Sequence, residues 1–274
     1  MPLPKASIRS ALIQLQRTLG IWPQQFGLIT GAPRSGTTAV GSWLTSQREV
    51  AGLIESRVLI AVNQYIDQVY RFRRLEENAD LLVEGARQVI CDYYCREYCS
   101  KHTLFGRHLM LDKEPLEPIA FPDRQYRAFL DNVRIVFPGA KFFFLVRHPL
   151  ATVFSMSQRK WGISLTQGEP RQFSIEEHTE NWCDCVDCIL EYIDDPDAYI
   201  CQFERLVQSP QEESQRIFDF FGIRNGKPFQ PRETKNHRFS PSDRALILER
   251  AQPQMAALQR RGLYESANPV EDAG

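Results

Sequence analysis

Short apolar runs recur along the chain, separated by longer stretches in which apolar residues return every three or four positions. A run that is apolar on both faces is typical of a strand in a covered parallel sheet, and the clearest is Lys-Phe-Phe-Phe-Leu-Val at 141–146. This pattern predicts a central strand. Further strands are predicted at 26–30, 108–111 and 199–203.

The longer stretches have the spacing of amphipathic helices, and two begin with capping signals. Ser174 and Glu177 have the spacing of a capping box, and Ser209 precedes a proline that suits the first helical position. Helices are predicted at 37–47, 59–77, 81–100, 123–137, 150–160, 174–193, 209–221 and 240–261. Strands that alternate with helices predict an α/β fold, a three-layer arrangement with an open, mainly parallel sheet and right-handed crossovers.

The chain of 274 residues is long enough for one large core. It contains no repeat, low-complexity tract or long linker, so a single domain over residues 1–274 is expected. Residues 1–25 are expected to form an amphipathic helical extension, residues 222–240 a long basic loop, and residues 265–274 a disordered tail.

Composition excludes several classes of protein. The net charge of −1 gives no bulk attraction to nucleic acid or to an anionic membrane surface. No apolar run approaches the roughly 20 residues that span a bilayer, and no secretory h-region precedes the first strand, so a cytoplasmic location and no membrane partner are expected. The seven cysteines are an odd number, which argues against a fully paired disulfide framework.

Two cysteine clusters lack the paired short spacings of a structural zinc site. They are interpreted as small packing residues, with a metal or redox role as the alternative, and no metal is expected. The clusters are Cys91, Cys95 and Cys99, and Cys183, Cys185 and Cys188.

The most specific pattern follows the first predicted strand, where residues 26–38 read as a strand, a Gly-rich turn and a helix start. Backbone N–H groups in such a turn, together with a helix N-terminus, form an anion site. Gly31 and Gly36 have P-loop spacing, but Thr37 stands where a Walker loop has Lys, and the cation, Arg34, comes earlier. The loop therefore suits a ligand that ends one anionic group sooner than a nucleoside triphosphate. The alternative is an ordinary strand–turn–helix corner.

A second anion site is predicted after the central strand. Arg147 lies at the carboxyl end of that strand, the edge where open α/β sheets bind ligands. Ser155 and Arg159 share a face of the following helix. An Arg fork with a hydroxyl suits a phosphate monoester, although Arg159 and Lys160 are also compatible with solvated surface charges.

These residues resemble sulfotransferases that use 3′-phosphoadenosine 5′-phosphosulfate (PAPS), and in particular tyrosylprotein sulfotransferases of a soluble, bacterial type. The resemblance extends from about residue 26 to about residue 222. The matching segments are Gly-Ala-Pro-Arg-Ser-Gly-Thr-Thr at 31–38, Glu-Ser-Arg-Val at 55–58, Leu-Asp-Lys-Glu-Pro at 111–115, the segment 146–160 and Phe-Glu-Arg-Leu-Val at 203–207. His148 departs from the pattern, which commonly has an acidic residue there.

The resemblance implies a P-loop NTPase-like sulfotransferase fold and a metal-free reaction with PAPS as co-substrate. The 5′-phosphosulfate is then held by Pro33, Arg34, Ser35, Gly36, Thr37 and Thr38, and the 3′-phosphate by Arg147 and Ser155, with Arg159 beside them. The resemblance makes Glu55 the base. Its position after an apolar stretch suggests burial that raises its proton affinity, whereas the alternative is a helix-start carboxylate facing water.

Lys113 follows a predicted strand, so its ammonium is expected to reach the bridging oxygen of the donor and to stabilise its charge. The alternative is a surface salt bridge with Asp112 or Glu114. Arg34 is expected to clamp the sulfuryl oxygens, and Arg57 to steer the substrate. Lys235 or Arg238 in the late loop is expected to cover the 3′-phosphate, with a plain surface loop equally compatible. No histidine has a position that supports a catalytic role.

The acceptor is left open among a peptide tyrosine, a glycan and a small molecule, and the resemblance suggests a homodimer. Two other functions compete. A nucleotide kinase-like P-loop enzyme would need a Lys before the hydroxyl and Mg²⁺-dependent binding of ATP. A non-catalytic nucleotide-binding interaction protein would keep both anion sites without needing Glu55 or Lys113.

Overall fold

The computed structural model describes residues 25–72, 79–99, 107–121, 123–159, 161, 172–231 and 239–264. These residues form two compact units. Unit 1 comprises residues up to 28, 41–114 and 127–141, and unit 2 comprises residues 29–40, 115–126 and 142 onward. The predicted helical extension before residue 25 and the predicted tail after residue 264 lie outside the described residues, except for Gln25 itself.

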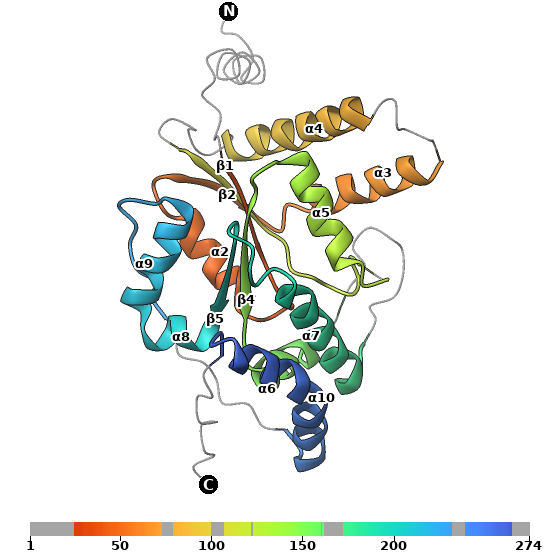
Figure 1. Ribbon diagram of the computed structural model, residues 1–274, viewed down its shortest axis with the longest axis vertical. Helices are drawn as coiled ribbons and strands as arrows, with labels where there is room; N and C mark the ends of the chain where they lie inside the picture. The colour runs from red at the N-terminus through yellow and green to blue at the C-terminus, as the bar shows by residue number, and fades with distance from the viewer. Residues whose placement is uncertain are drawn as a thin grey trace, which may run out of the picture. The chain divides into compact units, whose positions relative to one another are not determined.

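The strands belong to a five-stranded sheet with the order β2-β3-β1-β4-β5 (Figure 1). The pairs β2–β3 and β4–β5 are parallel. The sheet flanked by helices confirms the predicted α/β class. The strands are β1 (Gln25–Thr30), β2 (Val50–Ile54), β3 (Leu109–Lys113), β4 (Lys141–Val146) and β5 (Ala198–Gln202).

The helices agree with the predicted set to within a few residues, apart from the short α8, which was not predicted. They are α2 (Thr37–Thr45), α3 (Val58–Phe72), α4 (Ala79–Cys99), α5 (Tyr126–Val136), α6 (Pro149–Ser157), α7 (Ile175–Leu190), α8 (Phe203–Gln208), α9 (Pro210–Phe221) and α10 (Pro241–Arg260). The capping box predicted at Ser174 is present, and its hydroxyl accepts from the backbone of Glu177 at 3.1 Å. Residues 222–231 contain neither helix nor strand, and 232–238 lie outside the described part of the chain.

In unit 1, α3 packs beside α4, and α4 packs on β2. Phe26 in β1 stacks on Phe137 with ring centroids 4.2 Å apart and meets Tyr94 of α4 edge-on. These rings bury the start of β1 against α4 and against the residue that follows α5. In the parallel register of β2 and β3, Ile54 is opposite Lys113, so both strands end at the same level.

Unit 2 is built around β4, in which the five residues after Lys141 are buried. Helices α6, α7 and α10 lie side by side (Figure 1). The fully buried Trp182 of α7 donates its indole N–H to the carbonyl oxygen of Arg147 at 3.0 Å. The chain immediately after β4 is therefore fixed from within the core.

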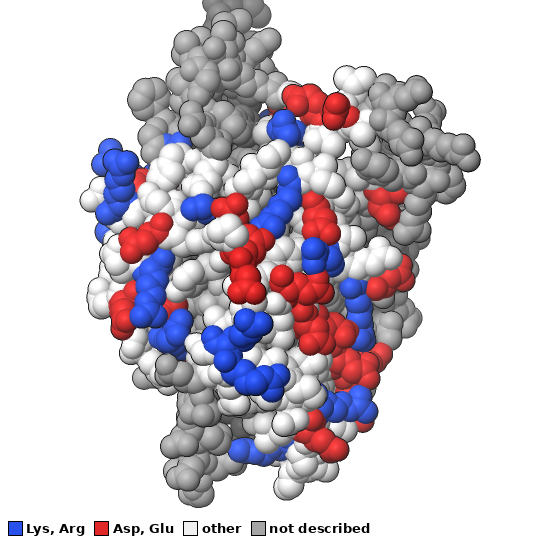
Figure 2. Space-filling view, in the orientation of Figure 1, with Lys and Arg blue, Asp and Glu red and all other residues white. Residues whose placement is uncertain are grey.

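Charges of both signs are mixed on the surface shown in Figure 2, and three of the described cysteines are buried. Lys and Arg are interspersed with Asp and Glu on the face shown in Figure 2. Cys185, Cys188 and Cys201 are buried and form no disulfide bond within the described part of the chain. Among the described residues, none of the helices is both long and apolar enough to cross a membrane, and His, Cys, Asp and Glu form no group of three that could hold a metal ion.

Candidate functional site

The loop between β1 and α2, in unit 2, requires glycine at both ends. Gly31 has φ +145°, and a Cβ there would collide with the carbonyl oxygen of Leu145 in β4. Gly36 has φ +99°, and a Cβ there would lie 2.6 Å from the ring of Phe203. The amide of Leu116 donates to the carbonyl oxygen of Gly31 at 3.0 Å. The loop is thus packed closely between neighbouring backbone and an aromatic ring, as a backbone anion site requires.

Arg34, at the tip of this loop, connects the two predicted anion sites of unit 2. Its guanidinium Nε donates to the hydroxyl of Ser155 at 3.0 Å, and its carbonyl oxygen lies 3.5 Å from Nη1 of Arg147. Its φ of +69° is unusual for a residue with a side chain and is a conformation that clusters at functional sites. The structure therefore brings Arg34, Arg147 and Ser155 together.

Two hydroxyl groups of the same segment are buried without a hydrogen-bond partner among the described residues. They belong to Thr30, at the end of β1, and Ser35, inside the loop. The neighbouring Thr37 is buried and Thr38 exposed, while Pro33 is buried beneath the tip. Unpaired buried hydroxyls are costly, so the loop has hydrogen-bonding capacity that a ligand or water can satisfy.

Arg147 follows β4 and lies over the ring of Phe203, with its Cζ atom 5.0 Å from the ring centroid. Burial lowers the pKa of this guanidinium, the nearby charge of Glu204 opposes that effect, and the charge of Arg34 adds to it. Two like charges held this close favour an anion between them.

His148 caps the helix that follows Arg147. Its Nδ1 accepts from the amide of Leu150 at 3.2 Å, and its own amide donates to Glu204 at 2.9 Å. Burial, followed by the charges of Arg244 and Arg147, lowers the pKa of the imidazole to about 4. At neutral pH His148 is therefore an uncharged helix cap.

Arg159 does not lie where the sequence predicted. The helix expected over 150–160 ends at Ser157, so Arg159 lies beyond it and shares no helical face with Ser155. The exposed Arg159 guanidinium instead lies over the indole of Trp161, 5.4 Å from the ring centroid. Lys160, Lys235 and Arg238 lie outside the described residues.

In unit 1, Glu55 and Lys113 meet at the ends of β2 and β3. The Lys113 ammonium forms an ion pair with Oε1 of Glu55, and the Glu55 amide donates to the carbonyl oxygen of Lys113 at 2.8 Å. The side chain of Lys113 is 2% exposed and that of Glu55 27%. A Cβ on Gly41 of α2 would lie 3.2 Å from the stem of Lys113, so the glycine leaves room for it. The alternative of a surface lysine paired with Asp112 or Glu114 was wrong, whereas the carboxylate of Glu55 is only partly buried.

In the turn after β2, the two residues that follow Glu55 also pair with acidic side chains of the segment that contains Lys113. Ser56 donates its hydroxyl to Asp112 at 2.6 Å, and the amide of Arg57 donates to Oε1 of Glu114. The guanidinium of Arg57 pairs with Glu55 through Nη2 at 3.2 Å and with Glu114 through Nη1 at 3.5 Å. Both oxygens of the Glu55 carboxylate therefore contact cations, Oε1 the Lys113 ammonium and Oε2 the Arg57 guanidinium.

Burial dominates the electrostatics beneath this turn. It raises the pKa of Asp112, although the hydrogen bond from Ser56 opposes the shift. Burial and the charge of Asp112 raise the pKa of Glu114 to about 8, against the effect of Arg57. Asp112, Glu114 and Glu204 lie within the matching segments, but the sequence predicted no site role for them beyond the alternative salt bridge of Asp112 or Glu114 with Lys113. Their signal was a charge directly after an apolar run.

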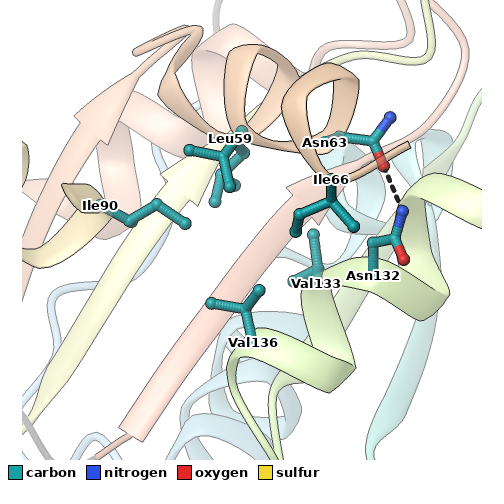
Figure 3. Close-up of a pocket in the computed structure, with 8 residues that line it drawn as sticks. Leu59, Asn63, Ile66, Ile90, Asn132, Val133 and Val136 are labelled. Atoms are coloured by element: carbon teal, nitrogen blue, oxygen red, sulfur yellow. Dashed lines mark hydrogen bonds between the residues drawn. The ribbon is translucent and has the colours of Figure 1, made fainter. Parts of the chain in front are cut away.

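Unit 1 also contains a small, open cavity between α3, α4 and α5, whose volume of about 10 Å³ has room for no more than about one water. The two asparagines at its rim are joined by a hydrogen bond of 2.8 Å (Figure 3). None of the lining side chains is titratable, so the cavity offers no acid–base chemistry. It is lined by Leu59, Val62, Asn63, Ile66, Ile90, Asn132, Val133 and Val136.

Three comparisons with known proteins agree with these observations. The model of the sulfotransferase family matches residues 28–226. The Drosophila melanogaster protein-tyrosine sulfotransferase is 27% identical over 202 residues, which cover 71% of this chain and 37% of that protein. The chain thus spans little more than a third of that relative. A sulfotransferase structure from Alicyclobacillus acidocaldarius superposes with a TM-score of 0.53 at 15% identity, covering 85% of this chain and 94% of that one, so the two share a fold.

Proposed function

This chain belongs to the sulfotransferase family, and from that premise we propose that it transfers a sulfuryl group from PAPS to an acceptor hydroxyl. One observation carries the proposal. A carboxylate that can take a proton, Glu55, is paired with a buried ammonium, Lys113, that can stabilise a leaving oxygen. Sulfuryl transfer needs both groups, whereas nucleotide binding alone needs neither.

Unit 2 supports a binding role at the two ends of the donor. Arg34 and the loop amides suit the 5′-phosphosulfate, and Arg147 with Ser155 suits the 3′-phosphate. Glu55, Lys113, the loop and Arg147 each come at or just after the carboxyl end of a strand. Carboxyl ends of parallel strands are where α/β sheets bind ligands, which supports a binding or catalytic role for these residues in each unit.

In the proposed reaction, Glu55 removes the proton of the acceptor hydroxyl as its oxygen attacks sulfur. The bond between sulfur and the bridging oxygen of the 5′-phosphate breaks, and that oxygen keeps the electron pair. Lys113 and Arg34 stabilise the charge that develops on the leaving phosphate and the sulfuryl oxygens. The products are a sulfate ester and adenosine 3′,5′-bisphosphate, and Glu55 returns its proton to solvent.

A peptide tyrosine is the proposed acceptor. The name of the Drosophila relative supports it, and so does Arg57, whose partly exposed guanidinium adjoins Glu55 and provides a charge for steering a substrate. Incubation with radiolabelled PAPS and parallel panels of tyrosine peptides, glycans and phenols tests this. Label in peptides only is expected, and label in another panel alone would replace the proposed acceptor class.

The kinase-like alternative is tested by measuring ATP binding and phosphoryl transfer beside the sulfuryl-transfer assay. Thr37 stands in place of the P-loop lysine, so Mg²⁺–ATP is expected to bind much more weakly than adenosine 3′,5′-bisphosphate. Phosphoryl transfer from ATP without any sulfuryl transfer would overturn the proposed function. Tight binding of the bisphosphate without turnover on any panel would favour the non-catalytic alternative.

A further inference from the structure

The carboxylate of Glu114 contacts both the backbone amide and the guanidinium of Arg57. Its Oε1 accepts from the backbone amide of Arg57, while its Oε2 lies 3.5 Å from Nη1 of the same arginine. Glu114 is itself completely buried, at the end of β3, so it cannot move without disturbing the core. The other guanidinium nitrogen, Nη2, is left to pair with Glu55.

The backbone that Glu114 holds is strained. Glu55 has φ +53° and Arg57 has φ +62°, conformations that residues with side chains rarely adopt. Such strain persists only where surrounding contacts impose it. Here the Lys113 carbonyl holds the amide of Glu55, and Glu114 holds the amide of Arg57.

We propose that Glu114 is a positioning residue that fixes Arg57 in this turn and, through it, orients the Glu55 carboxylate. The proposal rests on the proposed function, in which Glu55 is the base. The carboxylate of Glu55 forms two ion pairs. Its Oε1 contacts Lys113, whose side chain is buried, and its Oε2 contacts Arg57, whose side chain is 37% exposed. Glu114 gives the second, more exposed contact additional support.

The charge of Glu114 gives this role a measurable signature. Arg57 and Lys113 favour its ionised form, Asp112 disfavours it, and burial brings its pKa to about 8. Burial, followed by the charges of nearby carboxylates including this one, raises the pKa values of Tyr93 and Tyr94 in α4. Both are raised above the ordinary value of 10, so neither tyrosine titrates near pH 8. As the pH rises through about 8, Glu114 ionises and holds Arg57 more firmly, so the rate constant kcat is expected to rise with an inflection there.

The test compares Glu114→Gln with wild type and with Glu84→Gln, which removes an exposed carboxylate from the same unit. We expect Glu114→Gln to lower kcat on the order of tenfold and to abolish the inflection near pH 8, with the Kd of adenosine 3′,5′-bisphosphate unchanged. Glu84→Gln should match wild type. In an Arg57→Ala background, Glu114→Gln should have little further effect, because it acts through Arg57.

Full additivity of the two substitutions in kcat, or an inflection that survives in Glu114→Gln, would overturn the proposal. Urea unfolding of wild type, Glu114→Gln, Arg57→Ala and the double variant measures the coupling of Glu114 with Arg57 independently of activity. Additive losses of stability would also overturn it. If wild type transferred no sulfuryl group while the unfolding cycle showed coupling, the function would fail and the contact between Glu114 and Arg57 would stand.

Discussion

Lys113 forms an ion pair with Glu55 in which the ammonium is almost completely buried, while the carboxylate keeps 27% of its side chain exposed. A buried ammonium is costly unless it is paired, so this lysine depends on its glutamate. The reverse dependence is weaker, because water can reach the carboxylate. The pair therefore holds a cation in place beside a base that a substrate can approach.

Replacing Lys113 by Met keeps an unbranched stem and removes the charge. We expect kcat to fall about 10²- to 10³-fold, because the leaving oxygen loses its stabilising cation. The Kd of the bisphosphate should change much less than kcat, and circular dichroism should show a folded chain. A kcat equal to that of wild type would remove Lys113 from the mechanism.

Arg147→Ala should act on binding. The guanidinium lies over Phe203 next to Arg34, and its loss should weaken adenosine 3′,5′-bisphosphate on the order of 10- to 100-fold in calorimetry. Arg127→Ala, which removes an exposed arginine paired within α5, is the control and should bind normally. Equal affinities of the two variants would contradict the assignment of Arg147.

Gly36→Ala tests the packing of the loop. Alanine at this position would have to adopt φ +99°, and its Cβ would lie 2.6 Å from the ring of Phe203. We therefore expect the unfolding free energy to fall by about 1–3 kcal/mol and bisphosphate binding to weaken. Gly85→Ala is the matched control, because a Cβ there meets nothing within 4 Å and Ala favours the helix by up to about 1 kcal/mol. Urea unfolding of both variants measures the difference. Similar stabilities would show that the loop tolerates a side chain.

The lowered pKa of His148 should make the stability of the folded chain depend on pH. Its pKa is lowered to about 4 in the folded chain from an ordinary value near 6.5, so the unfolded chain binds more protons between these values. Stability should therefore fall as the pH drops from 6.5 to 4, with a contribution from His148 of up to about 3 kcal/mol. His148→Asn keeps a capping acceptor but cannot titrate, so its stability should fall less over this range. Because His178 has the same lowered pKa and remains in both proteins, the difference isolates His148.

Patterns within short stretches predicted much of the fold. The runs of β1 and β4 and the periodic helices are local signals, and so are the two glycines of the β1–α2 loop. β2 was missed because Val-Ala-Gly-Leu-Ile at 50–54 is short and contains glycine, and its strand conformation depends on pairing with β3. Contacts between distant segments decide such an element.

The site shows the same division. Sequence motifs were enough to select four candidate site residues, Arg34, Glu55, Lys113 and Arg147. The motifs did not predict which side chains these residues contact. The link from Arg34 to Ser155 crosses 121 positions, and that from Arg57 to Glu114 crosses 57. Arg159 was misplaced because a helix end was predicted three residues too late. The buried carboxylates Asp112 and Glu114 needed the parallel register of two strands to be recognised.

Glu55→Gln tests the central claim most directly. The amide keeps the shape of the side chain but cannot take a proton, so sulfuryl transfer from labelled PAPS should fall by about 10²- to 10⁴-fold, while calorimetry gives a bisphosphate Kd close to that of wild type. A Glu55→Gln variant that transfers label at the wild-type rate would contradict the account.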